Sequence, residues 1–145
     1  MPTTPSPPVE PDETPATAVR ATGACLCGAV RYEVTGPLRD VVLCHCAMCR
    51  RTHGHVGAYS ASARDALRMV EARGLRWYAS SPFARRGFCA DCGASVFWER
   101  IGSDSVSIAA GTLDAPTGLS TTLQIFVDDA GDYYTPDPAI PRRVG

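Results

Sequence analysis

Hydrophobic and polar residues alternate along several short segments of the chain, a pattern that predicts β-strands with one buried face. Residues 29–35 are the clearest case. Val30, Tyr32 and Val34 share one face of this segment, and charged residues occupy the other. Further short β-rich segments lie at residues 41–43, 75–78, 95–98, 106–108 and 123–127. Gly, Pro, Asp and Ser residues separate these segments, so we expect each strand to end in a turn.

No segment carries a sustained helical pattern, and the best candidates for short helical turns are residues 47–52 and 63–67. Short strands at this spacing predict a mainly β fold of antiparallel sheets, arranged as a sandwich or a barrel-like domain. The 145 residues, 45% of them hydrophobic, suffice for one such domain with a packed core.

The N-terminal residues differ in composition from the rest of the chain. Six of the 12 prolines lie within the first 15 residues, which contain almost no large apolar side chain. Such a segment buries too little apolar surface to offset the entropy lost on ordering. We therefore predict a disordered Pro- and Thr-rich tail over residues 1–20 and one folded domain over residues 21–142.

The formal net charge of −1 argues against nucleic-acid and membrane-surface partners, because both are usually held by basic surfaces. No apolar stretch reaches the ~18 residues of a membrane-spanning helix. The first residues lack the basic start and apolar stretch of a secretory signal, so we expect a cytoplasmic protein. No pattern in the sequence specifies an oligomeric state.

The seven cysteines are the most informative feature of the sequence. An odd number fits a disulfide framework poorly, and cysteines in a reducing compartment are more often metal ligands or catalytic groups. The spacings C-x-C and C-x-x-C both direct two thiols toward one point, the second through a tight turn that is followed here by Gly93. We call the two outer pairs the quartet (Cys25, Cys27, Cys89 and Cys92) and the central group the trio (Cys44, Cys46 and Cys49).

This division matches the two kinds of zinc site. Structural sites are closed by four protein ligands, and catalytic sites keep three protein ligands and one exchangeable position. The quartet is therefore predicted to hold a structural zinc and the trio a catalytic zinc. Three alternatives remain: His45, His53 or His55 closes the trio, the thiols form disulfides or bind no metal, or they hold an iron–sulfur cluster.

Four motifs resemble, in the same order, those of the glutathione-dependent formaldehyde-activating enzyme and centromere protein V family. They are residues 23–32 (GACLCGAVRY), 44–51 (CHCAMCRR), 88–93 (FCADCG) and 111–114 (GTLD). The resemblance implies a small zinc-containing β-tent fold of one domain, like that of the Rab-interacting exchange chaperones. It also implies a structural zinc on the quartet and a labile catalytic zinc on the trio, two Zn²⁺ per chain.

The resemblance further implies a carbon–sulfur lyase similar to S-(hydroxymethyl)glutathione synthase, which joins glutathione to formaldehyde. The three cysteines of the trio suggest the same chemistry, which we state as a hypothesis. Three thiolates would leave a bound zinc with a net charge of −1, so it should prefer the sulfur of a small thiol and hold it as a thiolate. That thiolate would attack formaldehyde or a related aldehyde. The alternative is a non-catalytic zinc-stabilised binding or adaptor module.

Several neighbouring residues are candidates for supporting roles. Arg50 and Arg51 follow the trio and could anchor the carboxylates of glutathione, or form a solvated pair on a turn. His45 should point away from the metal, because both its neighbours point toward it. The remaining histidines, His53 and His55, are expected on the surface of a Gly-rich turn. A solvated strand end is expected at Arg85 and Arg86, and core or pocket-wall positions at Trp77, Phe88, Phe97 and Trp98.

Overall fold

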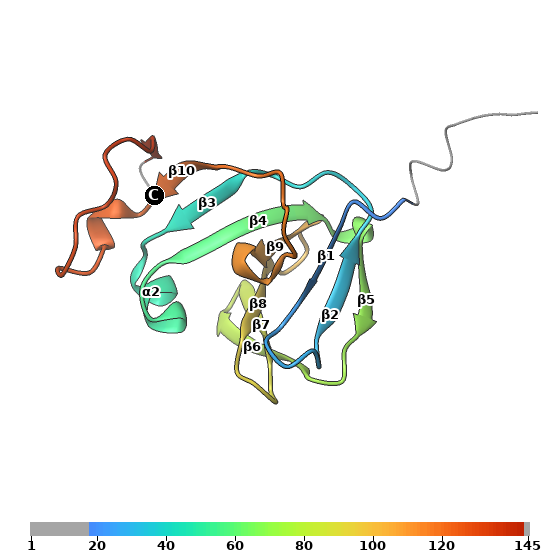
Figure 1. The fold of residues 1–145 in the computed structure, drawn as a ribbon. Helices are drawn as coiled ribbons and strands as arrows, with labels where there is room; N and C mark the ends of the chain where they lie inside the picture. The colour runs from blue at the N-terminus through green and yellow to red at the C-terminus, as the bar shows by residue number, and fades with distance from the viewer. Residues whose placement is uncertain (1–17, 144–145) are drawn as a thin grey trace, which may run out of the picture.

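The computed structural model describes residues 18–143, whose strands form two sheets (Figure 1). The small sheet has the order β1-β2-β5, with β1 at Ala21–Ala24, β2 at Arg31–Val34 and β5 at Leu67–Glu71. The large sheet has the order β11-β10-β3-β4-β9-β8-β7-β6. Its strands are β3 (Val41–Cys44), β4 (Gly57–Ala63), β6 (Leu75–Ser81), β7 (Ala84–Cys89), β8 (Ser95–Arg100), β9 (Ser105–Ala109), β10 (Thr121–Ile125) and β11 (Arg142–Arg143). The tail predicted over residues 1–20 lies outside the described residues, except for 18–20.

The helices are short. They are α2 (Ala47–His53) and the 3₁₀ helices η1 (Arg64–Ala66), η2 (Ala110–Thr112) and η3 (Val127–Asp129). Cys46 caps the start of α2, where its Sγ accepts a hydrogen bond from the Cys49 amide at 3.3 Å. Gly54 ends the helix with a φ of 81°. No helix in the described residues is both long enough and apolar enough to cross a membrane.

The predicted mainly β, single-domain β-tent fold is confirmed, and strands form in every segment where they were expected. The last predicted strand, at residues 123–127, begins and ends two residues earlier than expected, because Phe126 adopts a left-handed conformation and η3 follows it. The sequence pattern does not predict β1, β4, β5, β7 and β11. Most strand pairs are antiparallel, whereas β10 runs parallel to both its neighbours, β3 and β11.

The hydrophobic core lies between the two sheets. The predicted buried face is confirmed, since Val30, Tyr32 and Val34 are at most 1% exposed. Tyr32 packs against Phe97 of β8 with the ring centroids 5.3 Å apart, which also confirms the core position expected for Phe97. Gly23 of β1 approaches this tyrosine so closely that a Cβ would overlap its hydroxyl group.

Alternation along the strands sends other side chains to the opposite face of the large sheet. There Trp98 of β8 lies in register with both Ser107 of β9 and Arg86 of β7. Val42 of β3 is likewise in register with Tyr59 of β4. All five side chains line the same pocket, so this face of the sheet forms part of its wall.

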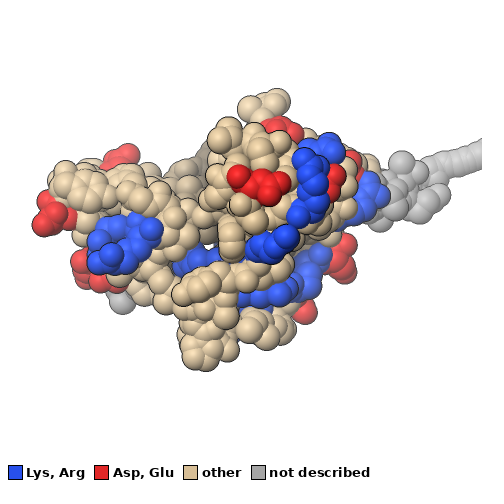
Figure 2. Space-filling view, turned by 90° about the horizontal axis from the view of Figure 1, so that it is seen from below, with Lys and Arg blue, Asp and Glu red and all other residues tan. Residues whose placement is uncertain are grey.

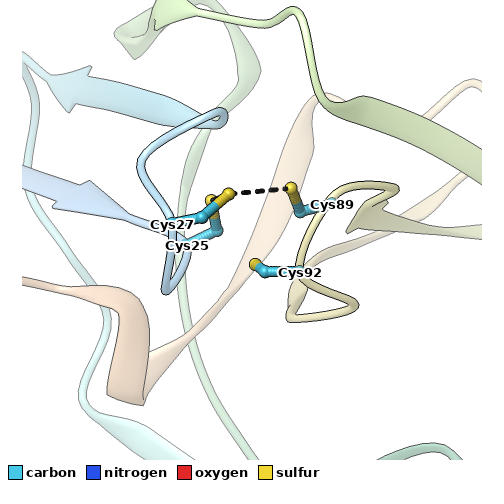
Figure 3. A group of neighbouring side chains, drawn as sticks. All are labelled: Cys25, Cys27, Cys89 and Cys92. Atoms are coloured by element: carbon cyan, nitrogen blue, oxygen red, sulfur yellow. Dashed lines mark hydrogen bonds between the residues drawn. The ribbon is translucent and has the colours of Figure 1, made fainter.

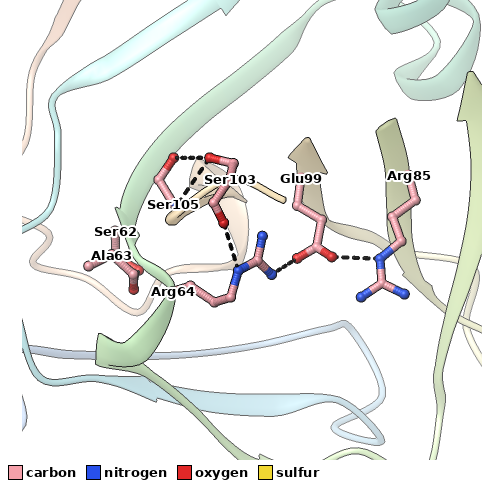
Figure 4. Close-up of polar contacts among 7 residues, drawn as sticks. All are labelled: Ser62, Ala63, Arg64, Arg85, Glu99, Ser103 and Ser105. Carbon is pink, nitrogen blue, oxygen red and sulfur yellow. Dashed lines mark hydrogen bonds and ion pairs between the residues drawn. The ribbon is translucent and has the colours of Figure 1, made fainter. Parts of the chain in front are cut away.

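An ion-pair cluster around a buried glutamate ties η1 to two neighbouring strands of the large sheet (Figure 4). Glu99 of β8 is 5% exposed and pairs with both Arg64 and Arg85, the latter through Nε at 2.6 Å. The Arg85 guanidinium also lies 4.0 Å from the centre of the Trp77 ring. Arg85 therefore packs against Glu99 and Trp77 while 40% of its side chain stays exposed, so it is only partly the solvated strand end that was expected. On the face shown in Figure 2, arginines form separate patches with acidic groups nearby.

Candidate metal centres and pocket

The quartet joins the turn after β1 to the end of β7 and the turn that follows it. All four sulfurs lie within 4.8 Å of one another and point toward a common centre (Figure 3). The Cys25 and Cys27 sulfurs are 3.8 Å apart, and the Cys27 and Cys89 sulfurs are 3.7 Å apart. Tetrahedral zinc with Zn–S bonds of ~2.3 Å requires a sulfur separation of about 3.8 Å. The quartet therefore fits a zinc ion in both donor type and spacing.

The backbone around the quartet is shaped to deliver these thiols. Gly28 and Gly93, each following a cysteine, have φ values of 85° and 79°, which only glycine adopts without strain. Gly74 packs so closely that an added Cβ would lie 2.8 Å from Cys89 Sγ and 2.8 Å from Ala29 Cβ. The positive φ of Gly93 confirms the turn glycine that was predicted there.

Thiols this close compete for ionisation. Backbone amides of Ala94 and Cys27 donate hydrogen bonds that lower the pKa of Cys92 to about 6. The Ala29 amide favours the Cys27 thiolate, but burial and the neighbouring thiols raise the pKa of Cys27 to about 11. A divalent cation would remove this competition by accepting all four thiolates.

The trio combines the end of β3 with the start of α2. Cys44 is the last residue of β3, Cys46 is the N-cap, and Cys49 is buried in the first turn of the helix. The three sulfurs also lie within 4.8 Å of one another. The hydrogen bond from Cys44 and the nearby Arg86 guanidinium lower the pKa of Cys49 to about 6, whereas Cys49 and burial raise the pKa of Cys44. The trio is therefore a second set of thiolate donors suited to zinc.

Both ring nitrogens of His45 form hydrogen bonds with side chains outside the trio. The Gln124 amide nitrogen donates to the backbone carbonyls of Asp137 and Ile140, so its Oε1 accepts from His45 Nε2 at 2.9 Å. Nδ1 is then the acceptor for the Tyr134 hydroxyl. The side chain points away from the trio, as expected, and ties the Cys44–Cys46 segment to residues 131–141 near the C-terminus.

The other two histidines also bind tyrosines. His53 is half-buried, with Nε2 2.8 Å from the Tyr59 hydroxyl, so the surface position expected for it is wrong. Burial and the positive charge of Arg86 lower the pKa of His53. His55 is exposed as expected, with Nδ1 2.7 Å from the Tyr133 hydroxyl. Within the described residues, no histidine belongs to the trio's group of ligand atoms.

The trio forms part of the wall of a pocket with a volume of about 720 Å³. The large apolar side chains of the lining come from α2, the β6–β7 turn, β8, the β3–β10 pair and the residue after β10. These side chains are Val42, Met48, Phe83, Trp98, Leu123, Ile125 and Phe126. The quartet is not part of this lining, so of the two cysteine groups only the trio faces this pocket.

Arginines are the charged groups of this lining. Arg86 is 8% exposed, and its guanidinium lies 3.7 Å from Cys49 Sγ, so the solvated position expected for it is wrong. Arg39 and Arg143 also line the pocket, and burial together with the charge of Arg143 lowers the pKa of Arg39. Arg50 and Arg51 lie on α2 and are not among the lining residues.

Comparison with known proteins identifies a consistent set of relatives. The model of the family described as glutathione-dependent formaldehyde-activating enzyme matches residues 20–129, which include both cysteine groups. An uncharacterized lyase of Schizosaccharomyces pombe is 29% identical over 114 residues, which are 77% of this chain and 82% of that protein. The crystal structure of a Rhodobacter sphaeroides protein matches with a TM-score of 0.56 and 27% identity, covering 65% of this chain and 88% of that one.

Proposed function

Because the chain belongs to the glutathione-dependent formaldehyde-activating enzyme family, we propose that it is a zinc-dependent carbon–sulfur lyase. It joins a low-molecular-weight thiol, glutathione or an analogue, to formaldehyde or a related aldehyde and gives an S-hydroxymethyl-type adduct. It binds two Zn²⁺ per chain, a structural ion at the quartet and a catalytic ion at the trio.

The observation that carries this proposal is the unequal placement of the two cysteine groups. The quartet supplies four ligands and lies outside the pocket, whereas the trio supplies three and forms part of the pocket wall. A zinc ion at the trio would offer its fourth position to a thiol sulfur and keep that sulfur in the thiolate form. The trio thus fits a catalytic zinc site, and the quartet fits a closed structural zinc site.

Arg86 supplies the charge that this site requires. Three thiolates around a divalent ion leave one net negative charge, which is costly in a buried place unless a cation offsets it. The Arg86 guanidinium lies beside Cys49 and has no carboxylate partner among residues 18–143. It therefore stabilises both the trio and an anionic ligand next to it.

The remaining pocket arginines suit the carboxylates of glutathione. Arg39 and Arg143 lie close enough for the charge of one to lower the pKa of the other, and a carboxylate between them would relieve this repulsion. The sequence-based assignment of Arg50 and Arg51 as anchors stays a prediction. Because they lie outside the lining, we place the thiol's carboxylates first at Arg39 and Arg143.

In the proposed reaction, the thiol sulfur bonds to the carbonyl carbon and the carbonyl electron pair moves to the oxygen. The oxygen takes up the proton that the thiol has lost. Tyr59 is suited to deliver it, because its hydroxyl accepts a hydrogen bond from Arg86 at 3.4 Å and can donate to His53 Nε2 or to a ligand. The apolar lining limits the access of water to this step.

Exchange NMR with glutathione and ¹³C-formaldehyde tests the proposal. The zinc-loaded protein should accelerate interconversion of the free thiol and its hydroxymethyl adduct above the uncatalysed rate. Cys49→Ser should abolish the acceleration, and Tyr78→Leu, on an exposed side chain outside the pocket, should retain it. A zinc-loaded protein that accelerates nothing would instead be a non-catalytic binding module.

A further inference from the structure

We propose that the natural aldehyde carries a large apolar group, aryl or branched alkyl, which lies against the apolar wall of the pocket beside the trio. This inference rests on the proposed function and narrows the class of its second substrate.

The pocket is larger than a one-carbon aldehyde requires. Its volume of about 720 Å³ lies in the upper half of the range for drug-sized ligands, roughly 300–1,000 Å³. Glutathione would place its carboxylates at the arginines and its sulfur at the trio. Formaldehyde adds one carbon and one oxygen, so the apolar part of the wall would remain in contact with water.

That apolar wall adjoins the reacting atoms. The parallel pairing of β3 with β10 sets Ile125 beside Cys44 and Leu123 beside Val42, and all four side chains line the pocket. Trp98 extends the wall on β8. No acidic side chain of the described residues is part of the lining. An aldehyde substituent at this place would therefore meet hydrocarbon and an indole ring, which favour an apolar group.

The rim of the pocket continues the apolar surface. Met48, Phe83 and Phe126 all line it, yet they are 48%, 53% and 39% exposed. Exposed apolar patches mark interaction surfaces, ligand-binding grooves among them, and these three side chains also line the pocket. Phe126 is also held at a φ of 56°, an unfavourable conformation for a bulky residue, and such conformations cluster at ligand sites.

The reaction with such an aldehyde balances without another reactant. The thiol sulfur bonds to the carbonyl carbon, the carbonyl electron pair moves to oxygen, and the oxygen takes the thiol proton. The product is a hemithioacetal that carries the apolar group on the carbon next to sulfur, where it would contact the β3–β10 wall.

Binding of stable thioethers tests the apolar wall without turnover. S-(2-phenylethyl)glutathione should bind the zinc-loaded protein at least tenfold more tightly than S-methylglutathione, as expected when an apolar pocket gains several carbons. Trp98→Leu and Phe126→Ala should each reduce that ratio at least threefold, and Tyr78→Leu should leave it unchanged. A ratio below tenfold in the parent protein, or an equal loss in Tyr78→Leu, overturns the proposal.

Exchange NMR separates this proposal from the proposed function. With glutathione, kcat/KM should be at least tenfold higher for phenylacetaldehyde than for formaldehyde. Acceleration with formaldehyde but no such preference refutes the apolar aldehyde and leaves the proposed function standing. Acceleration of neither aldehyde refutes the proposed function. A still higher kcat/KM for 4-(mercaptomethyl)benzoate with formaldehyde would assign the apolar group to the thiol and overturn the proposal.

Discussion

A series of Gly→Ala substitutions measures how tightly the backbone packs against each cysteine group. At Gly74 the new Cβ would lie 2.8 Å from Cys89 Sγ in the quartet and 2.8 Å from a buried alanine. At Gly57 it would lie 3.2 Å from Cys49 Sγ in the trio and 3.1 Å from the rings of His53 and Tyr59. Gly111 has no neighbouring atom within 4 Å and serves as the control.

The expected changes in the free energy of unfolding depend on whether the atoms next to each new Cβ can move. The neighbours of Gly74 are fully buried, so overpacking should cost ~2–3 kcal/mol, partly offset by the ~0.4–1 kcal/mol that alanine contributes by restricting the unfolded chain. The net loss of about 2 kcal/mol corresponds to a Tm decrease of roughly 6–10 °C for a domain of this size. At Gly57 the aromatic rings can shift by a few tenths of an ångström, so the net change should stay within about 0.5 kcal/mol.

Gly57→Ala should instead act on metal binding, because the methyl group displaces the Cys49 sulfur. Disturbing the surroundings of a metal ligand typically lowers affinity ~10- to 100-fold, so we expect zinc at the trio to weaken by at least tenfold. Thermal denaturation followed by circular dichroism and zinc competition with a chelating dye measure the two effects. Equal Tm losses at Gly57 and Gly74, or unchanged zinc affinity in Gly57→Ala, would contradict these expected effects.

Three further predictions test other parts of the site and fold. Cys46→Ser should reduce bound zinc from two ions to one with the fold retained, because serine keeps the helix cap. Cys92→Ser should instead lower Tm sharply. Elemental analysis measures the bound zinc of each variant, and circular dichroism measures its Tm. Glu99→Gln should destabilise the protein by about 2–3 kcal/mol in urea titrations, whereas Glu33→Gln, in a more exposed pair, should cost under ~1 kcal/mol. Arg86→Met should raise KM for glutathione at least tenfold, as measured by exchange NMR.

The parts of the site that the sequence predicts are those set by local geometry. The C-x-x-C turn and its Gly93 need only a few neighbouring residues to aim two thiols at one point, so spacing alone identifies them. The orientation of His45 likewise follows from alternation between two ligands. Strand β2 is predictable for the same reason, because its buried face is a regular pattern of large apolar residues.

Other features depend on distant partners. Strand β4 has the sequence GAYSASA, whose small residues carry little hydrophobic signal, and β7 has ARRGFC, in which two arginines interrupt the pattern. Without β7 as a strand, Arg85 and Arg86 cannot be assigned to opposite faces. In the structure, one binds the buried Glu99 and the other faces the pocket. Their roles are set by the register of β7 with β8, which no local pattern encodes.

The same strand couples the two cysteine groups. β7 carries Arg86 on the pocket face and ends at Cys89 of the quartet, and strand alternation turns residues three apart to opposite faces. A metal at the quartet would hold the end of β7 against the turn after β1, and so would help to fix the register that places Arg86 beside Cys49. Loss of the quartet should therefore impair the pocket, whereas loss of the trio leaves β7 in place. This asymmetry explains why Cys92→Ser should lose stability and activity together and Cys46→Ser should lose activity alone.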